Sequence, residues 1–252
     1  GGWLIQNHGL LDGFRLACLY AAAAAIASAL IVFVFLKETL RPRLGAKSNF
    51  LNRSTLTSLM KLLRSLPTSL KALMVSYALV AFANGAVGYY YIIYAKRVIG
   101  LTLFEWGIIV SLQFLLVNVL KIPGAWFSDR FGKRKAMIVS VLTCAPCTIL
   151  FTLSRSFVEA LTVALLLIVT GIYYGPAHEA LQADLTPRMM RGRITALWEV
   201  GNSFSGALGT LIGGFLFQIV DPALPFYLFT AAELTAALLL ISIVKEPIRK
   251  EV

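Results

Sequence analysis

Seven long apolar runs, separated by short polar stretches, dominate the pattern of hydrophobic and polar positions along the chain. Each run is about 18–27 residues long, the length that an α-helix needs to cross a hydrocarbon core of about 30 Å. None of the runs alternates apolar and polar residues with a period of two, as the strands of a membrane β-barrel do. The pattern therefore predicts an all-α, polytopic transmembrane bundle of seven spanning helices. The predicted spans are 16–36, 72–94, 104–121, 136–153, 157–178, 194–220 and 224–244.

The polar stretches between the runs differ in their content of Lys and Arg. When 37–71, 121–135, the turn after the fifth run and the C-terminus are placed inside, nearly all of the 23 Lys and Arg residues lie there. The residues left outside are Arg15, Lys96, Arg97 and Arg155. Such an excess of basic residues marks the cytoplasmic side of a membrane protein. We therefore expect a multi-pass protein of the cell membrane with a cytoplasmic C-terminus.

The same pattern divides the chain into three parts. Residues 1–36 are predicted to form the outer end of an earlier helix, an external turn and one spanning helix. Residues 37–71 are predicted to be a cytoplasmic basic linker, and 72–252 a six-helix transmembrane unit. Apolar residues within 55–66 recur at helical spacing, which indicates an amphipathic helix on the inner leaflet. Because the chain opens on two glycines in the middle of this pattern, we interpret it as a fragment or a processed form.

The composition fits a membrane protein. The 252 residues are 58% hydrophobic and only 14% charged, whereas a soluble domain averages about 25% charged residues. The mean hydropathy is +0.79. The net charge of +11 does not indicate a nucleic-acid partner, because the basic residues are confined to loops and do not interleave with aromatic residues. The expected surroundings of the apolar runs are the lipid bilayer.

The sequence lacks the motifs of common catalytic sites. It has no Gly-Lys-Ser phosphate loop, no Gly-x-Ser-x-Gly elbow and no His-Glu-x-x-His pair. Cys144 and Cys147 bracket Pro146 in an apolar run, and zinc would need two further ligands that are not nearby in sequence. We therefore expect no enzymatic activity, no cofactor and no metal site.

A short charged turn between the third and fourth runs carries the most specific motif. It reads Ala-Trp-Phe-Ser-Asp-Arg-Phe-Gly-Lys-Arg-Lys over 125–135. Gly132 lets the backbone turn, and Asp129 is a lone acid in a basic loop, where it needs a partner. The turn resembles the signature loop of the major facilitator superfamily of transporters. The glycine that this family usually has at position 125 stands one place earlier here, at Gly124.

This resemblance implies a fold of two six-helix halves joined by a cytoplasmic linker. The first predicted span would be the last helix of the first half, and 72–252 would be the whole second half. The missing N-terminal half is then an expected partner of this chain. The resemblance also implies secondary active transport of a small solute, with the two halves rocking around a site near the membrane midplane.

A second charged turn follows the fifth run and resembles the matching hairpin of the second facilitator half. Asp184 and Pro187 end the fifth helix, and Arg191 and Arg193 begin the sixth. We expect Asp129 to face the N-terminal turn of the sixth helix, where the helix dipole and either arginine would stabilise an anion. In the resembling family the matching Asp braces the cytoplasmic side in the outward-facing state, whereas the alternative role is only to set topology. The expected latch residues are Asp129, Arg130, Gly132, Arg134, Asp184, Arg191 and Arg193.

The sixth run supplies the first candidate for a solute or proton site. Glu199 lies about two turns inside this run, where an acid is costly unless it faces protein or water. The alternative is a structural ion pair with Arg191 or Arg193. Ser203 lies on the same stripe as Glu199. Small residues also recur every four positions and predict a smooth face for close helix packing: Gly201, Ser205, Gly209 and Gly213.

Further candidates lie on the second, third and fifth runs. Tyr174 and His178 share one stripe of the fifth run, and His178 can change charge near neutral pH. A hydrogen-bonded histidine at the membrane edge is the alternative. Asn84 and Tyr91 share a face of the second run, although tyrosines there also fit an interfacial belt. Gln113, in the middle of the third run, is expected to face the cavity.

These candidates place the cavity wall on the second, third, fifth and sixth runs. The resemblance makes the first, fourth and seventh runs peripheral, so no functional role is expected for Glu233 in the seventh. The candidates are only modestly polar, which favours efflux of amphipathic compounds over uptake of a small metabolite. The sequence leaves four modes of transport open: proton coupling, coupling to another cation, uniport and exchange. The alternative function is that of a non-transporting membrane receptor or scaffold that retains the fold.

Overall fold

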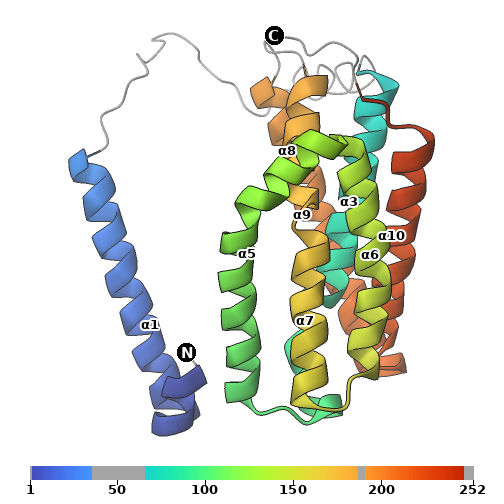
Figure 1. Ribbon diagram of the computed structural model, residues 1–252. Coiled ribbons are helices and arrows are strands. Elements are labelled where there is room, and N and C mark those ends of the chain that lie inside the picture. The colour runs from blue at the N-terminus through green and yellow to red at the C-terminus, as the bar shows by residue number, and fades with distance from the viewer. Residues whose placement is uncertain (1, 36–65, 187–190, 247–252) are drawn as a thin grey trace, which may run out of the picture. The chain divides into compact units, whose positions relative to one another are not determined.

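The regular structure in the described part of the chain is entirely helical, as Figure 1 shows for the computed structural model. The structure describes residues 2–35, 66–186 and 191–246. The helices are α1 (Gly2–Phe35), α3 (Thr68–Gly88), α4 (Tyr90–Tyr94), η1 (Ala95–Ile99), α5 (Leu103–Phe131), α6 (Lys133–Leu153), α7 (Phe157–Gly171), α8 (Tyr174–Leu185), α9 (Arg191–Phe215), η3 (Leu216–Val220) and α10 (Leu224–Ser242). The elements η1 and η3 are single π-helical turns that end α4 and α9.

Seven helical stretches of the described chain are long and apolar enough to cross a membrane, and each coincides with a predicted span. Several extend beyond the apolar run that predicts them. The third span, for example, runs from Leu103 to Phe131, whereas its apolar run ends near residue 121. Hydropathy detects only the part of a helix that lies in lipid, while the hydrogen-bonded backbone continues into the polar ends. The chain is therefore a multi-pass membrane protein with a helical bundle fold.

The chain divides into two units, Gly1–Ser65 and Leu66–Val252. In the first unit, α1 is interrupted at Gly9, which has a φ of 78°. This left-handed conformation is easily adopted only by glycine, and it separates a short N-terminal piece from the spanning helix. The predicted linker and its amphipathic helix lie outside the described residues, apart from their last few positions.

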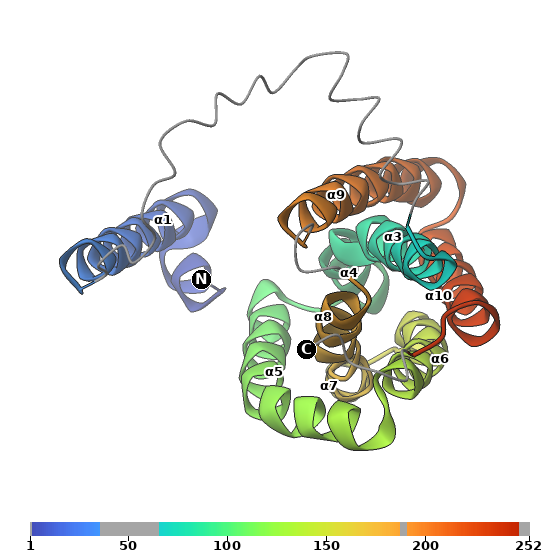
Figure 2. The same cartoon turned by 90° about the horizontal axis from the view of Figure 1, so that it is seen from above.

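The second unit is an arc of helices. α3 packs against α9 on one side and against α10 on the other, α10 packs against α6, α6 against α7, and α7 against α5. Figure 2 shows α9 and α5 at the two ends of this arc, with α8 inside it. α8 contacts α3, α5 and α6. The arc therefore surrounds an interior space that α6 and α10 both border.

A cluster of buried aromatic rings joins α4, α6 and α10. The ring centroids of Tyr94 and Phe226 are 5.0 Å apart, and those of Tyr91 and Phe151 are also 5.0 Å apart, both in edge-on arrangements. Such geometry is favourable for aromatic pairs. The Tyr94 hydroxyl donates a hydrogen bond of 2.9 Å to the carbonyl of Thr152, so the polar end of this buried ring is satisfied.

Two prolines shape the helices that border the interior. Pro123 lies inside α5 and Pro146 inside α6. Proline cannot donate to the carbonyl four residues earlier, and its ring crowds that turn, so helices bend there. Figure 1 shows α5 bending toward α6 before it ends. Beside the bend, a Cβ at the buried Gly124 would lie 3.3 Å from Ile172, so this glycine allows close contact between α5 and the turn that follows α7.

The close packing predicted from the glycine spacing of α9 is found at two of its four positions. A Cβ at Gly209 would overlap the carbonyl oxygen of Phe82, and a Cβ at Gly213 would overlap that of Ala86. The backbones of α3 and α9 therefore meet directly, which only glycine permits. Gly201 differs, because a Cβ there would have no neighbour within 4 Å.

We expect Gly209→Ala and Gly213→Ala each to destabilise the second unit, because the new methyl group would collide with a carbonyl of α3 that its own helix holds in place. Overpacking of this kind costs about 1–3 kcal/mol. Gly201→Ala is the matched control and should leave stability unchanged or slightly raised, since Ala favours a helix over Gly by up to ~1 kcal/mol. Thermal unfolding of the purified protein in detergent measures the effect. Equal melting temperatures for the three variants would contradict the role of this contact.

Candidate functional site

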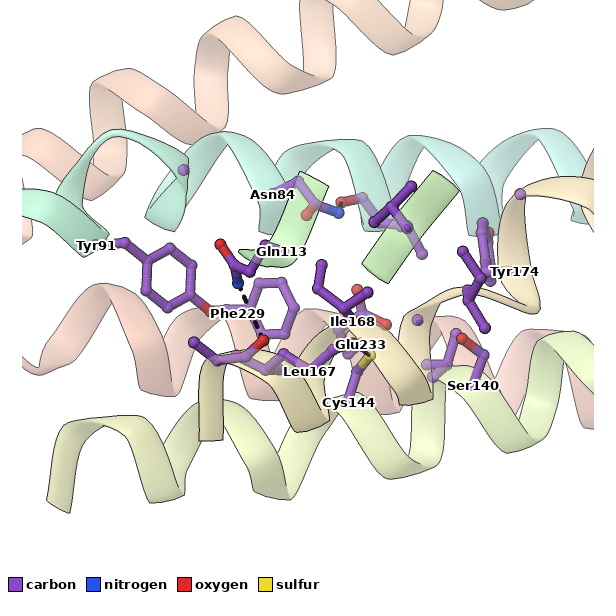
Figure 3. Close-up of a pocket in the computed structure, with 18 of the residues that line it drawn as sticks. Asn84, Tyr91, Gln113, Ser140, Cys144, Leu167, Ile168, Tyr174, Phe229 and Glu233 are labelled. Carbon is purple, nitrogen blue, oxygen red and sulfur yellow. Dashed lines mark hydrogen bonds between the residues drawn. The ribbon is translucent and has the colours of Figure 1, made fainter. Parts of the chain in front are cut away.

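One cavity of about 920 Å³ lies among α3, α4, α5, α6, α7, α8 and α10 of the second unit (Figure 3). Its wall is mostly apolar and includes the aromatic side chains of Tyr91, Trp106, Phe151 and Phe229. A few polar side chains interrupt this surface. Cavities of roughly 300–1,000 Å³ with this composition are typical of small-molecule sites.

A break in the fifth span forms part of the wall. α7 ends at Gly171 and α8 begins at Tyr174, with a turn between them. Pro176, in the first turn of α8, has no N–H to donate back to Ile172, so a helix continued through this point would lack one hydrogen bond. Gly171, Ile172 and Tyr174 all line the cavity. Irregular backbone at membrane depth is tolerated where it is enclosed by protein or lines a water-filled space.

Four of the polar candidates from the sequence lie in this wall: Asn84, Tyr91, Gln113 and Tyr174. Each amide donates one of its two N–H groups to a backbone carbonyl, from Asn84 Nδ2 to Val80 at 2.8 Å and from Gln113 Nε2 to Ala164 at 3.0 Å. Figure 3 shows the Gln113 bond and the amide oxygen on the opposite side of the group. The Tyr174 hydroxyl is buried without a hydrogen-bond partner in the described structure.

The other three candidates lie outside the wall of this cavity. Glu199 and Ser203 are on a face of α9 that is exposed in the second unit. Within the described residues, Glu199 forms no ion pair with Arg191 or Arg193. His178 is buried, with its ring stacked on that of Tyr77 at a centroid distance of 3.9 Å.

The stack around His178 joins three helices. The Trp198 ring of α9 lies 5.0 Å from the imidazole, and Tyr77 comes from α3. Neither His178 Nε2 nor Trp198 Nε1 has a hydrogen-bond partner among the described residues. Tyr174 stacks parallel to the imidazole at 5.9 Å and itself lines the cavity. His178 is therefore connected to the cavity through an aromatic ring rather than by facing it.

Sequence reasoning missed the contribution of α6 and α10 to the wall. Ser140 and Cys144 of α6 and Glu233 of α10 line the cavity, so the expectation that these helices are peripheral is wrong for this chain. Glu233 is only 3% exposed. The spacing of residues along the sequence offered one signal, because Glu233 shares one face of α10 with apolar residues at helical intervals. The structure shows that all members of this stripe are buried: Phe226, Phe229, Glu233, Ala236, Ala237 and Leu240. No α9 side chain lines this cavity.

Cys144 and Cys147 of α6 lie in packed surroundings within the second unit. Cys144 Sγ lies 3.2 Å from the hydroxyl of Thr170, which ties α6 to α7. Cys147 is buried. In the part of the chain that the structure describes, no three His, Cys, Asp or Glu side chains are grouped to hold a metal ion.

The basic turn, defined as residues 129–135, is held by contacts with two other helices. Lys133 Nζ and Asp184 Oδ2 form an ion pair of 2.5 Å, which joins the start of α6 to the end of α8. Arg134 donates from Nε to the carbonyl of Leu240 at 2.9 Å, and from its Nη2 to the carbonyl of Ile241. A cation at the last carbonyls of a helix is electrostatically favourable, so Arg134 stabilises the C-terminal end of α10.

Glu246 completes this connection between the basic turn and α10. Its carboxylate accepts a hydrogen bond of 2.5 Å from the backbone N–H of Arg134, in the first turn of α6. An anion is favourable at this helix end. The turn itself depends on Gly132, whose φ of 97° lies where side-chain-bearing residues are strained.

The remaining latch residues are arranged differently from the expected pairing. Asp129 and Arg130 are exposed, and Arg130 lies over the Trp126 ring at 5.3 Å. Within the described residues Asp129 forms no ion pair with Arg191 or Arg193. Arg191 instead donates to the carbonyl of Ala183 at 3.1 Å, at the end of α8. In this structure, Lys133 rather than Asp129 makes the ion pair between the two charged turns.

Comparisons with known sequences agree with the bundle fold and the motifs. The sequence pattern of the Major Facilitator Superfamily matches residues 1–178 and, in a second match, 73–252. Multidrug resistance protein 1 of Bacillus subtilis (strain 168) is 31% identical over 132 residues, which are 52% of this chain and 33% of that protein. Probable anion transporter 5 of Arabidopsis thaliana is 27% identical over 148 residues, or 58% of this chain and 34% of that protein.

A third relative is the Na(+), Li(+), K(+)/H(+) antiporter of Planococcus maritimus. It is 27% identical over 116 residues, which are 44% of this chain and 27% of the antiporter. In each of these three alignments the chain spans about a third of the relative's length or less.

Arg134→Met is expected to destabilise the second unit, because two carbonyls at the end of α10 lose their charged donor. A hydrogen bond from a charged group contributes about 1.5–3 kcal/mol, and partial exposure to solvent reduces this to roughly 1–2 kcal/mol. The neighbouring Lys135 is exposed and makes no described contact, so Lys135→Met is the matched control. Thermal unfolding in detergent distinguishes the two. A loss for Lys135→Met as large as that for Arg134→Met would show that only the net charge of the turn matters.

Proposed function

We propose, because the chain belongs to the major facilitator superfamily, that it forms part of a secondary transporter that moves a small solute by alternating access. In this proposal residues 72–252 supply one six-helix half and α1 is the last helix of the other. The facing half is then the main partner of this chain. The protein would lie in the cell membrane with its C-terminus and basic turn in the cytoplasm, as the distribution of Lys and Arg favours.

The observation that carries this proposal is the cavity of about 920 Å³ inside a helical membrane unit. A cavity with a mainly apolar wall, a broken helix and a few polar groups fits the binding of a solute near mid-membrane. The aromatic wall favours an amphipathic solute over a small, strongly polar metabolite. The three relatives are named for multidrug resistance, anion transport and cation–proton antiport. Efflux of amphipathic compounds is the direction that we propose.

The exposed face of α9 supports the proposal of a facing half. Glu199 and Ser203 lie on this face beside large apolar residues such as Phe204 and Leu211. A carboxylate that faces lipid is unfavourable, whereas one that faces a second helical half or a water-filled path is not. We propose that Glu199 contributes there to proton coupling. Asp129, Arg191 and Arg193 are also exposed and remain the proposed latch, in a conformation in which the charged turns approach each other.

The central test is flux. In proteoliposomes the 252-residue chain alone should not move amphipathic dyes, because one half cannot alternate access by itself. The same chain co-reconstituted with the facing half should move at least one of a panel of neutral, cationic and anionic dyes. Flux by the chain alone would contradict the need for a facing half. A complete assembly that inserts correctly but moves none of the panel would favour the receptor or scaffold function.

We further expect Glu199→Gln in the complete transporter to reduce proton-driven flux by about tenfold or more, since the amide cannot exchange a proton. Binding of dye to the cavity should remain, because Glu199 does not line it. The measurement is dye flux with and without an imposed pH gradient. Asp221→Asn is the matched control, because its exposed side chain caps the turn at Ala223 through an oxygen that an amide retains. Unchanged gradient-driven flux in Glu199→Gln would exclude this coupling role.

A further inference from the structure

We propose that Glu233 recognises the cationic group of an amphipathic solute and thereby makes the cavity selective for organic cations. The inference rests on the proposed transport function and names its solute class. It starts from a carboxylate in the wall of the cavity, on a helix that the sequence does not mark as functional.

Glu233 is buried and has no hydrogen-bond or ion-pair partner within the described residues. It lies in the middle of α10, is 3% exposed and lines the cavity. Among the described residues, no hydrogen bond or ion pair reaches its carboxylate. An ionised carboxylate in such surroundings is unfavourable unless a positive group meets it. A cation in the cavity would supply this missing interaction.

The charges around the cavity do not neutralise Glu233. Lys121 and Glu179 also line the space, but neither forms an ion pair with Glu233 in the described structure. Both are exposed, whereas Glu233 is fixed in the interior wall. The other polar groups near it are the hydroxyls of Tyr91 and Tyr174 and the thiol of Cys144, which carry no positive charge.

The neutral amide groups of the cavity do not select a solute by its charge. Asn84 and Gln113 each donate one of their two N–H groups to a backbone carbonyl. Each amide keeps its oxygen as an acceptor and a second N–H as a donor, so these groups can bind donors or acceptors of a solute. The charge preference of the cavity therefore rests on Glu233, whose carboxylate would accept from the N–H groups of a protonated amine.

The aromatic side chains of the cavity wall also favour a cationic, partly apolar solute. Tyr91, Trp106, Phe151 and Phe229 line the same cavity, and Phe229 lies one helical turn from Glu233 on α10. Figure 3 shows Phe229 and Glu233 among the residues that line the cavity. Aromatic faces attract cations, and this attraction is largest where water is excluded. The apolar body of the solute would contact these rings while its cationic end meets Glu233.

The test uses two probes of the same shape and opposite charge, tetraphenylphosphonium and tetraphenylborate. Their binding to the purified chain in detergent is measured by equilibrium dialysis against a blank of detergent alone. We expect specific binding of the cation and weaker binding of the anion. Glu233→Gln should reduce the affinity for the cation by about tenfold or more and should not reduce the affinity for the anion.

Two control variants and a melting temperature distinguish a loss of cation recognition from a loss of folding. Glu233→Asp retains the charge and should recover part of the cation affinity, while Asp221→Asn, which lies outside the cavity, should change neither probe. Glu233→Gln should keep the fold, because a neutral amide is easier to bury than a carboxylate. Its melting temperature checks this independently.

Three results would overturn the inference. Equal loss of both probes in Glu233→Gln would indicate a structural role. Preference for tetraphenylborate would indicate that Lys121 sets the charge selectivity. Absence of specific binding of either probe, in a chain that still supports dye flux with its facing half, would reject the cation site while leaving transport in place. Absence of flux from the complete assembly, by contrast, would reject the proposed function itself.

Discussion

The direct backbone contact between α3 and α9 is the constraint on which the rest of the second unit depends. Lipid is as apolar as the helices, so burial alone does not hold them together, and close packing has to set their positions. At Gly209 and Gly213 the two backbones touch. With α9 fixed on one side, α3 presents its other side to α10, which in turn packs against α6. This order places the stripe of α10 that contains Glu233 against the interior rather than against lipid.

The basic turn contacts the C-terminal end of α10. Arg134 binds the last carbonyls of α10, and Glu246, just beyond that helix, binds the first turn of α6. The motif that the sequence assigns to a latch on α9 therefore fixes α10 here, and Lys133 adds a contact to α8. Both α8 and α10 contribute to the cavity wall. The basic turn therefore contacts two of the helices that form the cavity wall.

The number and order of the helices follow from the sequence, because hydropathy and the lengths of apolar runs are local properties that the bilayer enforces. The smooth face of α9 is also readable, since glycines that recur every four residues in a membrane helix favour close packing. The composition of the cavity wall is harder to read from the sequence. Asn84 and Gln113 are recognisable as polar residues in apolar runs, but which helix faces which depends on packing between distant segments. The resemblance makes the helix of Glu233 peripheral, although its buried stripe has helical spacing. The pairing of Asp129 is equally hard to predict, since neighbouring turns offer several cations at similar distances along the chain.

The two acids within the spans differ in what surrounds them. Glu233 is enclosed by its own chain, so the low dielectric around it strengthens its interaction with any charge that reaches it from the cavity. Glu199 is exposed in the second unit, on a face with large apolar residues. A carboxylate cannot remain ionised against lipid at low cost, so this face requires a covering of protein or water. Within the described residues, two carboxyl groups thus lack a charged partner, one inside the cavity and one on the surface of α9. The proposed cationic solute would supply a partner to the first, and the proposed facing half would cover the second.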